Sequence, residues 1–116
     1  MKILLIINDP PYGTERCFNA LRLALALLKD EEKPEISVFL MADAVLAAKA
    51  GQSTPDGYYN LENMLKGVIR HADVALCGNC MDARGVGEGE LLPGSVRGTM
   101  PQLADLTLTA DKVLVF

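Results

Sequence analysis

The sequence contains no tryptophan and a single histidine, His71, among its 116 residues. Thioredoxin-type dithiol sites carry their paired cysteines early in the fold, usually beside a tryptophan, so the absence of tryptophan argues against that type. A structural zinc site needs four ligands, usually two cysteine pairs or one pair with histidines. With one histidine, and with Cys17 far from Cys77 and Cys80 in the sequence, a zinc site would need an unusual ligand set or a subunit interface.

The chain also lacks any run of basic residues and any long hydrophobic segment. Its net charge is −4, and Lys and Arg are scattered, which argues against nucleic acid and against an anionic membrane surface as partners. The hydrophobic run near the N-terminus covers only residues 3–7, which is too short for a signal peptide or a membrane span. We therefore expect a cytoplasmic protein with reduced thiols. Three cysteines are an odd number, which disfavours a purely structural disulfide framework.

Hydrophobic residues, in contrast, are abundant. They make up 50% of the chain, with 10 glycines in addition, and this apolar content exceeds what is usual for a small globular domain. The length fits one domain over residues 1–116. Because a small domain buries a limited fraction of its surface, we expect a homo-oligomer that covers hydrophobic helix faces between subunits; a Leu/Ala-rich monomer is the alternative.

Hydrophobic patterning predicts strands that alternate with helices. Strands are expected over residues 2–7, 36–41, 73–76, 95–97 and 112–116. Helices are expected over residues 15–28, 44–50, 61–69 and 101–109, with Thr14, Asp43, Asn60 and Thr99 as their N-caps. Strands that alternate with helices indicate right-handed crossovers and a mostly parallel sheet with helices on both faces. The sequence therefore predicts an α/β fold, a three-layer α/β/α sandwich.

The pair Cys77 and Cys80 directly follows the expected strand 73–76. A strand that ends in a thiol places it at the edge of the sheet where α/β folds bind ligands. The neighbouring Arg84 and a possible helix start would lower the pKa of the thiol and favour the reactive thiolate. One thiolate can then attack, and the second can resolve a mixed disulfide or a persulfide. The alternative is that both cysteines are small buried hydrophobic residues without reactivity.

Other polar residues are expected at the same edge of the sheet. Asp9, Tyr12 and Asp43 follow the first two strands and are candidates for a binding pocket around Cys77, although Asp9 could instead form a turn and Asp43 could cap a helix. Arg84 could pair with a carboxylate or stabilise a bound anion or thiolate. Cys17 falls on the hydrophobic stripe of the first helix and is expected to pack in the core.

A glycine-rich segment, residues 85–89, does not predict a nucleotide site. It lacks the spacing of a dinucleotide-binding loop and does not directly follow a strand. It also contains Glu88, with Glu90 next to it, and these carboxylates would repel phosphate. The sequence therefore predicts no nucleotide cofactor, and the glycines are expected to serve tight turns.

Several segments resemble the DsrE/DsrF-like family, and within it the YchN-like branch. The resembling segments are residues 11–13, 19–24, 39–45, 77–85 and 108–113, in order along nearly the whole chain. The resemblance implies a five-stranded, mostly parallel sheet and assembly as trimers or hexamers. It also implies sulfur carried as a cysteine persulfide, since better-understood relatives serve sulfur-oxidation and tRNA-thiolation relays. Cys77 matches the carrier cysteine of those relatives, whereas Cys80 is shared only within the YchN-like branch.

The resulting hypothesis is a cytoplasmic sulfur carrier without a dissociable cofactor. Cys77 would accept sulfur from a donor protein and pass it to an acceptor protein, and Cys80 would be an auxiliary thiol. Two alternatives stay open: an oligomeric protein that binds a small ligand or a partner with inert cysteines, and a dithiol redox protein that uses Cys77 and Cys80. No direct contact with nucleic acid or membrane is expected.

Overall fold

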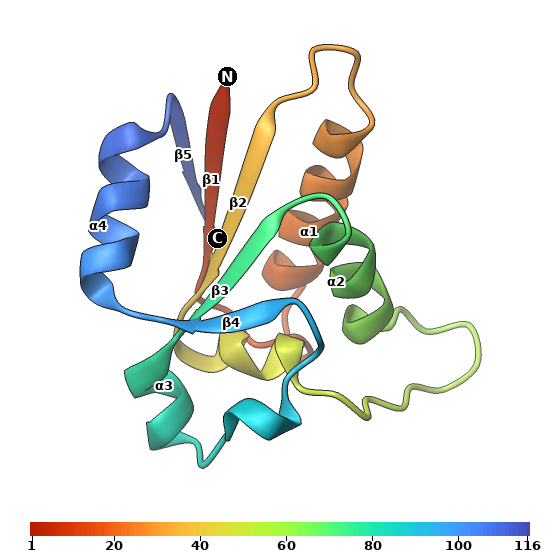
Figure 1. Ribbon diagram of the computed structural model, residues 1–116. Coiled ribbons are helices and arrows are strands. Elements are labelled where there is room, and N and C mark those ends of the chain that lie inside the picture. The colour runs from red at the N-terminus through yellow and green to blue at the C-terminus, as the bar shows by residue number, and fades with distance from the viewer.

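The computed structural model describes residues 1–116 and contains one five-stranded sheet in which every neighbouring pair of strands is parallel. The strand order is β4-β3-β2-β1-β5, as Figure 1 shows. The strands are β1 (Lys2–Ile7), β2 (Glu35–Leu40), β3 (Asp73–Cys77), β4 (Ser95–Gly98) and β5 (Lys112–Val115). All five strands therefore point their carboxyl ends toward the same edge of the sheet.

Helices cover both faces of the sheet, which confirms the predicted three-layer sandwich. The helical elements are α1 (Arg16–Leu28), η1 (Ala42–Ala48, a 3-10 helix), α2 (Leu61–Ile69), α3 (Gly78–Ala83), η2 (Glu88–Glu90, a 3-10 helix) and α4 (Met100–Thr109). In Figure 1, α1 and α2 lie to the right of the sheet and α4 lies to the left, while α3 lies beyond the carboxyl ends of the strands.

Two hydrophobic cores follow from this arrangement, because successive side chains of a strand point to opposite faces. The larger core has 22 buried residues, among them Ile3 and Leu5 of β1 and Leu21 of α1. The smaller core lies on the α4 face and joins Leu4, Phe39, Ala75 and Leu103. The central strands are buried on both faces, which explains why they are hydrophobic without alternation.

Two of the expected helix caps are confirmed. The Asn60 side chain accepts a hydrogen bond from the Asn63 N–H at 3.1 Å at the start of α2. The Thr99 hydroxyl accepts one from the Gln102 N–H at 3.3 Å at the start of α4. Each bond satisfies one of the free N–H groups of a first helical turn.

The other two caps are wrong. Glu15, not Thr14, occupies the N-cap of α1. The Thr14 hydroxyl lies one residue earlier, where it donates to the Asp9 carboxylate at 2.9 Å and accepts the Arg16 N–H at 3.4 Å. The segment expected as a helix over residues 44–50 is the 3-10 helix η1, which starts two residues earlier, and its N-cap is Met41. Asp43 lies in the first turn of η1, and its carboxylate pairs with Arg84.

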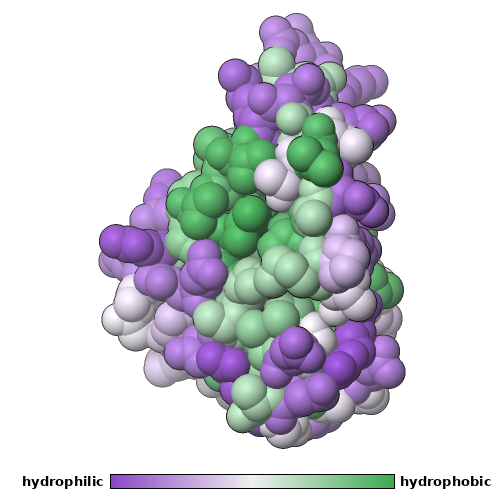
Figure 2. Space-filling view, turned by 90° about the vertical axis from the view of Figure 1, so that its left-hand side faces the viewer, coloured by the Kyte–Doolittle hydropathy of each residue, from purple (hydrophilic) through white to green (hydrophobic).

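Large hydrophobic side chains remain exposed on α4 and β5. Leu108 is 84% exposed and Val115 is 65% exposed, with Val113 beside them at the outer edge of the sheet. Figure 2, which views the molecule from the left-hand side of Figure 1, shows a continuous hydrophobic area on this face. No helix in the structure is both long and hydrophobic enough to cross a membrane.

Candidate functional site at the carboxyl edge of the sheet

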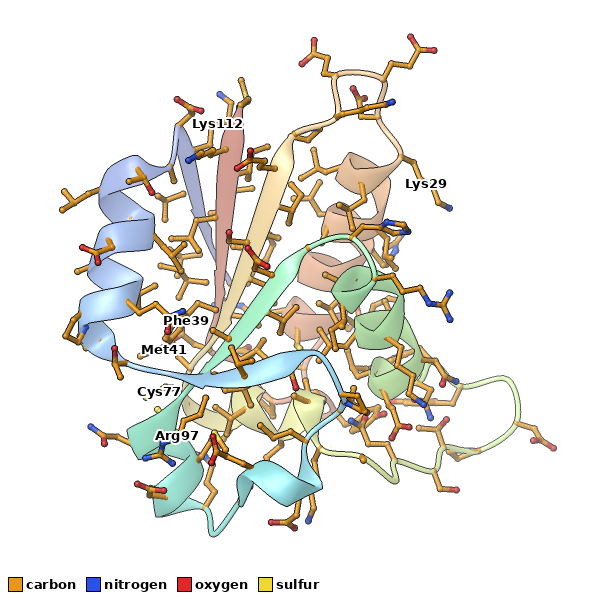
Figure 3. All side chains as sticks on the ribbon, in the orientation of Figure 1. Lys29, Phe39, Met41, Cys77, Arg97 and Lys112 are labelled. Atoms are coloured by element: carbon orange, nitrogen blue, oxygen red, sulfur yellow. The ribbon has the colours of Figure 1, made fainter.

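Cys77 is the last residue of β3, at the edge where the strands end. In the sheet it is paired with Gly98, the last residue of β4, and β2 ends beside it at Leu40. Figure 3 shows Cys77, Met41 and Arg97 together at this end of the molecule, whereas Lys112 lies at the opposite end. The strand expected over residues 73–76 therefore delivers the thiol to the predicted edge of the sheet.

Cys77 also occupies the N-cap position of α3, and its thiol is half-buried. Its Sγ accepts a hydrogen bond from the Cys80 N–H at 3.3 Å. On the α4 face of the sheet, its side chain packs against the smaller core, next to Phe39. The sulfur is therefore in contact with a polar backbone group on one side and with hydrocarbon on the other.

Cys80 lies on the opposite side of the strand, in α3, and contacts the larger core. Its Sγ accepts a hydrogen bond from the Ala42 N–H at 3.2 Å. Ala42 has a positive φ of 49°, a backbone conformation that costs energy for a residue with a Cβ, and this turn aims its N–H at the sulfur. Each thiol of the pair thus has its own backbone N–H donor.

The pKa of the Cys77 thiol is raised, not lowered as the sequence suggested. Burial is the largest cause, and hydrogen bonding with the Cys80 thiol adds to it, while the N–H groups of Cys80 and Asn79 act in the opposite direction. Burial disfavours the charged thiolate because it removes water from the sulfur. In the isolated chain, Cys77 is therefore mainly a protonated thiol at neutral pH.

The structure brings Asp43 and Arg84 together beside this pair, but as partners of each other. Arg84 Nε donates to Asp43 Oδ1 at 2.8 Å, and Arg84 Nη1 donates to the Cys80 carbonyl at 3.0 Å. This ion pair joins the end of α3 to η1. The positive charge of Arg84 is consequently shared with a carboxylate rather than directed at Cys77.

Asp9 and Tyr12 have other partners. Asp9 accepts a hydrogen bond from Thr14 and forms an ion pair with Arg16 at 3.9 Å. The Tyr12 hydroxyl donates to Gln52 Oε1 at 2.7 Å and accepts the Leu61 N–H at 3.1 Å. No hydrogen bond or ion pair of the structure joins Asp9 or Tyr12 to Cys77. Tyr12 instead holds the 52–60 loop against the start of α2.

Arg97 is a residue of this edge that the sequence reasoning missed. It lies in β4, one residue before the glycine that pairs with Cys77. Its guanidinium forms a two-pronged ion pair with the Asp82 carboxylate of α3, with both N···O distances at 2.8 Å. The sequence could have located it, because the strand expected over residues 95–97 ends in this arginine and therefore places it at the carboxyl edge of the sheet.

Cys17 does not belong to the site. It is buried in the larger core, as predicted, and burial raises the pKa of its thiol to about 12, with the Asp9 charge as a smaller cause. No group of three or more His, Cys, Asp or Glu side chains is close enough to hold a metal ion. The chemistry that this edge offers is that of two adjacent thiols.

The parallel sheet, its covering helices and the thiol at the end of β3 define an α/β sandwich protein with a cysteine at the carboxyl edge of its sheet. Within that class, residues 1–116 match the model of the DsrE/DsrF-like family. The chain belongs to this family, as the sequence predicted.

Individual relatives agree with this assignment. The chain is 44% identical to Protein YchN of Escherichia coli, over 99% of this chain and 98% of that protein. It is 38% identical to the uncharacterized protein MJ0989 of Methanocaldococcus jannaschii over 100% of both chains. It is 28% identical to Sulfurtransferase TusD of Pectobacterium atrosepticum, over 97% of this chain and 96% of that protein.

Solved structures show the same architecture. The crystal structure of the E. coli YchN protein superimposes with a TM-score of 0.94 at 44% identity, covering 99% of this chain and 98% of that one. A protein of unknown function, MTH1491 from Methanobacterium thermoautotrophicum, superimposes with a TM-score of 0.78 at 15% identity. The second comparison bears on the fold alone.

Proposed function

We propose that this protein is a sulfur carrier that holds sulfane sulfur as a persulfide on Cys77. The observation that carries the proposal is the position of Cys77: a half-buried thiol at the carboxyl edge of the sheet, with a backbone N–H donor and a second thiol next to it. Support also comes from the distant relatives named sulfurtransferase TusD. These features support a thiol that exchanges sulfur with another protein.

The transfer step exchanges one S–S bond for another. The Cys77 thiol gives its proton to solvent, and the thiolate attacks the outer sulfur of a persulfide on the donor. The new bond joins Cys77 Sγ to that sulfur, the donor's S–S bond breaks, and the donor leaves as a thiolate. The Cys80 N–H, already bonded to Sγ, stabilises the negative charge before the attack.

Cys80 supplies the second step in this proposal. Its thiolate attacks Cys77 Sγ, a disulfide forms between the two residues, and the outer sulfur leaves as hydrosulfide. The Ala42 N–H at 3.2 Å from Cys80 Sγ stabilises the attacking thiolate. Cys80 therefore limits the lifetime of the Cys77 persulfide when no acceptor protein is present.

The partners in this proposal are a sulfur donor protein and a sulfur acceptor protein in the cytoplasm. The chain itself forms a homo-oligomer, a trimer or a hexamer, through hydrophobic surface such as the face of α4 and β5. Exposed hydrophobic area of this kind is typical of protein contacts.

Intact-mass spectrometry after incubation with inorganic polysulfide tests the assignment. Wild type and Cys17→Ser are expected to gain one sulfur atom, and Cys77→Ser is expected to gain none, since Cys17 is buried and Cys77 is the acceptor. Cys80→Ser is expected to keep the added sulfur longer than wild type. A sulfur adduct that persists in Cys77→Ser contradicts the assignment.

A dithiol redox role is the second candidate, because Cys77 and Cys80 are free thiols in one helical turn, where the Cys77 sulfur accepts the Cys80 N–H. Diamide, which takes up the two hydrogen atoms of a dithiol, would then convert the pair to a disulfide without any sulfur donor. Rapid loss of two hydrogens from wild type in diamide, with no sulfur gained from polysulfide by Cys80→Ser, favours the redox role. If neither reaction occurs, the cysteines are inert and the protein is a binding protein.

A further inference from the structure

Arg97 lies against the backbone that follows Cys77. A Cβ atom placed on Gly78 would come within 2.7 Å of Arg97 Nε and 2.8 Å of Arg97 Cζ. Both distances are shorter than van der Waals contact, so a side chain at position 78 would have to displace the guanidinium. Gly78 is the first residue of α3 and is bonded directly to Cys77.

Asp82 fixes the guanidinium in this place. Its two carboxylate oxygens accept hydrogen bonds from Arg97 Nη1 and Nη2, each at 2.8 Å. A planar guanidinium and a carboxylate bonded at two points have little freedom to rotate. Arg97 comes from β4, and Asp82 of α3 therefore holds its guanidinium against Gly78.

We propose that Arg97, held over Gly78 by Asp82, is a positioning residue whose positive charge promotes ionisation of the Cys77 thiol. The inference rests on the proposed sulfur-carrier function, since it explains how a half-buried thiol becomes the attacking thiolate. The same charge stabilises the persulfide anion that forms on Cys77. Asp82 has two opposing effects, because it fixes the guanidinium and partly neutralises its charge.

Among the groups around Cys77, Arg97 is the cation that we expect to act on its thiol. From β2 and α4 the neighbours are hydrophobic, with Phe39 and Leu103 in the adjoining core. From α3 they are the Cys80 thiol and, through Arg97, the Asp82 carboxylate.

The remaining charges near this edge are either paired or act on Arg97 itself. Arg84 pairs with Asp43 and donates to the Cys80 carbonyl, so its guanidinium is held between α3 and η1, whereas that of Arg97 lies against Gly78. Hydrogen bonding to Asp82 raises the pKa of Arg97, and the charges of Glu88 in η2 and of Cys77 add to that effect. The charge of Cys77 is the smallest of these influences on Arg97.

The pH profile of Cys77 alkylation by iodoacetamide, read at this residue by peptide mapping of the full chain, tests the inference. Arg97→Met is expected to move the midpoint of the profile up by about 0.5 to 1 pH unit, because an opposite charge is lost. Asp82→Asn is expected to move it down, because the amide keeps the shape of the carboxylate but no longer neutralises Arg97. Gly78→Ala displaces the guanidinium and is expected to act like Arg97→Met.

Arg70→Met is the matched control, since it removes one positive charge from the exposed end of α2 and leaves the site intact. It is expected to leave the midpoint unchanged. An unchanged midpoint in Arg97→Met overturns the inference. A shift of the Asp82→Asn midpoint in the same direction as that of Arg97→Met also overturns it. Both variants would then act only by breaking the contact between Arg97 and Asp82, and not through the charge of Arg97.

The alkylation profile needs no sulfur donor, so the two proposals fail in distinguishable ways. If wild type takes up sulfur and the midpoints do not move, the role of Arg97 is wrong and the carrier function stands. If the midpoints move and wild type takes up no sulfur, the carrier function is wrong and Arg97 still controls the thiol.

Discussion

The three cysteines occupy three environments with different consequences for reactivity. Cys17 is enclosed by the larger core and has no polar partner among the hydrogen bonds of the structure. Cys77 and Cys80 are half-buried, and each sulfur accepts a backbone N–H. Because the thiolate is the reactive form, contact with N–H donors separates the pair from Cys17 in chemistry as well as in position.

Alkylation of the folded protein at pH 8 is expected to modify Cys77 and to leave Cys17 unmodified. Burial raises the pKa of Cys17 to about 12, whereas an ordinary thiol has a pKa of 9.0. At pH 8 the thiolate population of Cys17 is therefore about a thousandfold lower than that of an ordinary thiol. Peptide mapping of the modified protein gives the result, and Cys17 is expected to react only after denaturant is added. Early modification of Cys17 would show that α1 opens readily.

The buried Cys17 thiol also makes the free energy of unfolding depend on pH in the alkaline range. Its pKa is higher in the folded protein than the ordinary value of 9.0, so the folded state holds the proton more tightly. The resulting stabilisation is complete below pH 9 and is lost as the pH rises toward 12; by pH 10.5 the loss is about 1–2 kcal/mol. Urea unfolding of wild type and Cys17→Ala at pH 8 and 10.5 measures it, and the Cys17→Ala variant is expected to lose less stability over this interval.

At the scale of single elements, the turn into β4 depends on a glycine. Gly94 has a φ of +94°, and a Cβ atom there would come within 2.5 Å of Ile69 Cγ2 at the end of α2. A side chain would therefore meet both an unfavourable backbone conformation and an occupied space. This turn fixes the start of β4, and with it the register that sets Gly98 beside Cys77.

Gly94→Ala is expected to lower the free energy of unfolding by about 1–3 kcal/mol, from backbone strain and from the overlap with Ile69. Gly89→Ala is the matched control: its φ is ordinary and no atom lies near its Cβ position, so little change is expected. Denaturant titrations of both variants measure the difference. Equal stability of the two variants would contradict the role given to Gly94.

Most elements could be predicted because their signals are local. The hydrophobic runs of β1 and β2 and the caps Asn60 and Thr99 each act over a few residues. For α3 the sequence indicated only a possible helix start near Arg84, after Cys80. In the structure it begins at Gly78, where the Cys77 sulfur satisfies the Cys80 N–H that would otherwise be free.

The candidate site could be predicted only in part, for a different reason. The position of Cys77 follows from one strand, so the sequence locates it. The neighbours of Cys77 depend on strand order and register, which join Arg97 to this edge and leave Asp9 and Tyr12 with other partners. The effect of burial on the Cys77 thiol likewise depends on the fold around it, and it opposes the lower pKa that Arg84 suggested.

At the scale of the whole molecule, the two faces of the sheet are unequally covered. Two α-helices and η1 pack on one face, whereas α4 covers the other alone. Hydrophobic side chains of α4 and β5 consequently stay exposed, and they form the continuous area seen in Figure 2. Part of the high hydrophobic content of the chain therefore lies on this exposed face and not in the core.

Light scattering is expected to show an oligomer for wild type and a smaller species for Leu108→Asp. Leu108 is 84% exposed, so the substitution leaves the fold of the single chain intact while it places a charge in the hydrophobic face. Tyr58→Asp is the control, because Tyr58 is half-exposed and lies in the 52–60 loop on the other side of the sheet. A wild-type protein of monomer mass would contradict the proposed assembly.

The segment between α1 and β2 lies at the end of the molecule opposite to α3 (Figure 1). Its residues Asp30, Glu31, Glu32 and Lys33 are all exposed. A biotin attached there would anchor the protein to a sensor chip with its sulfur atoms directed into the flowing solution. The donor and acceptor proteins that the proposed function requires could then be sought with the site free of the support.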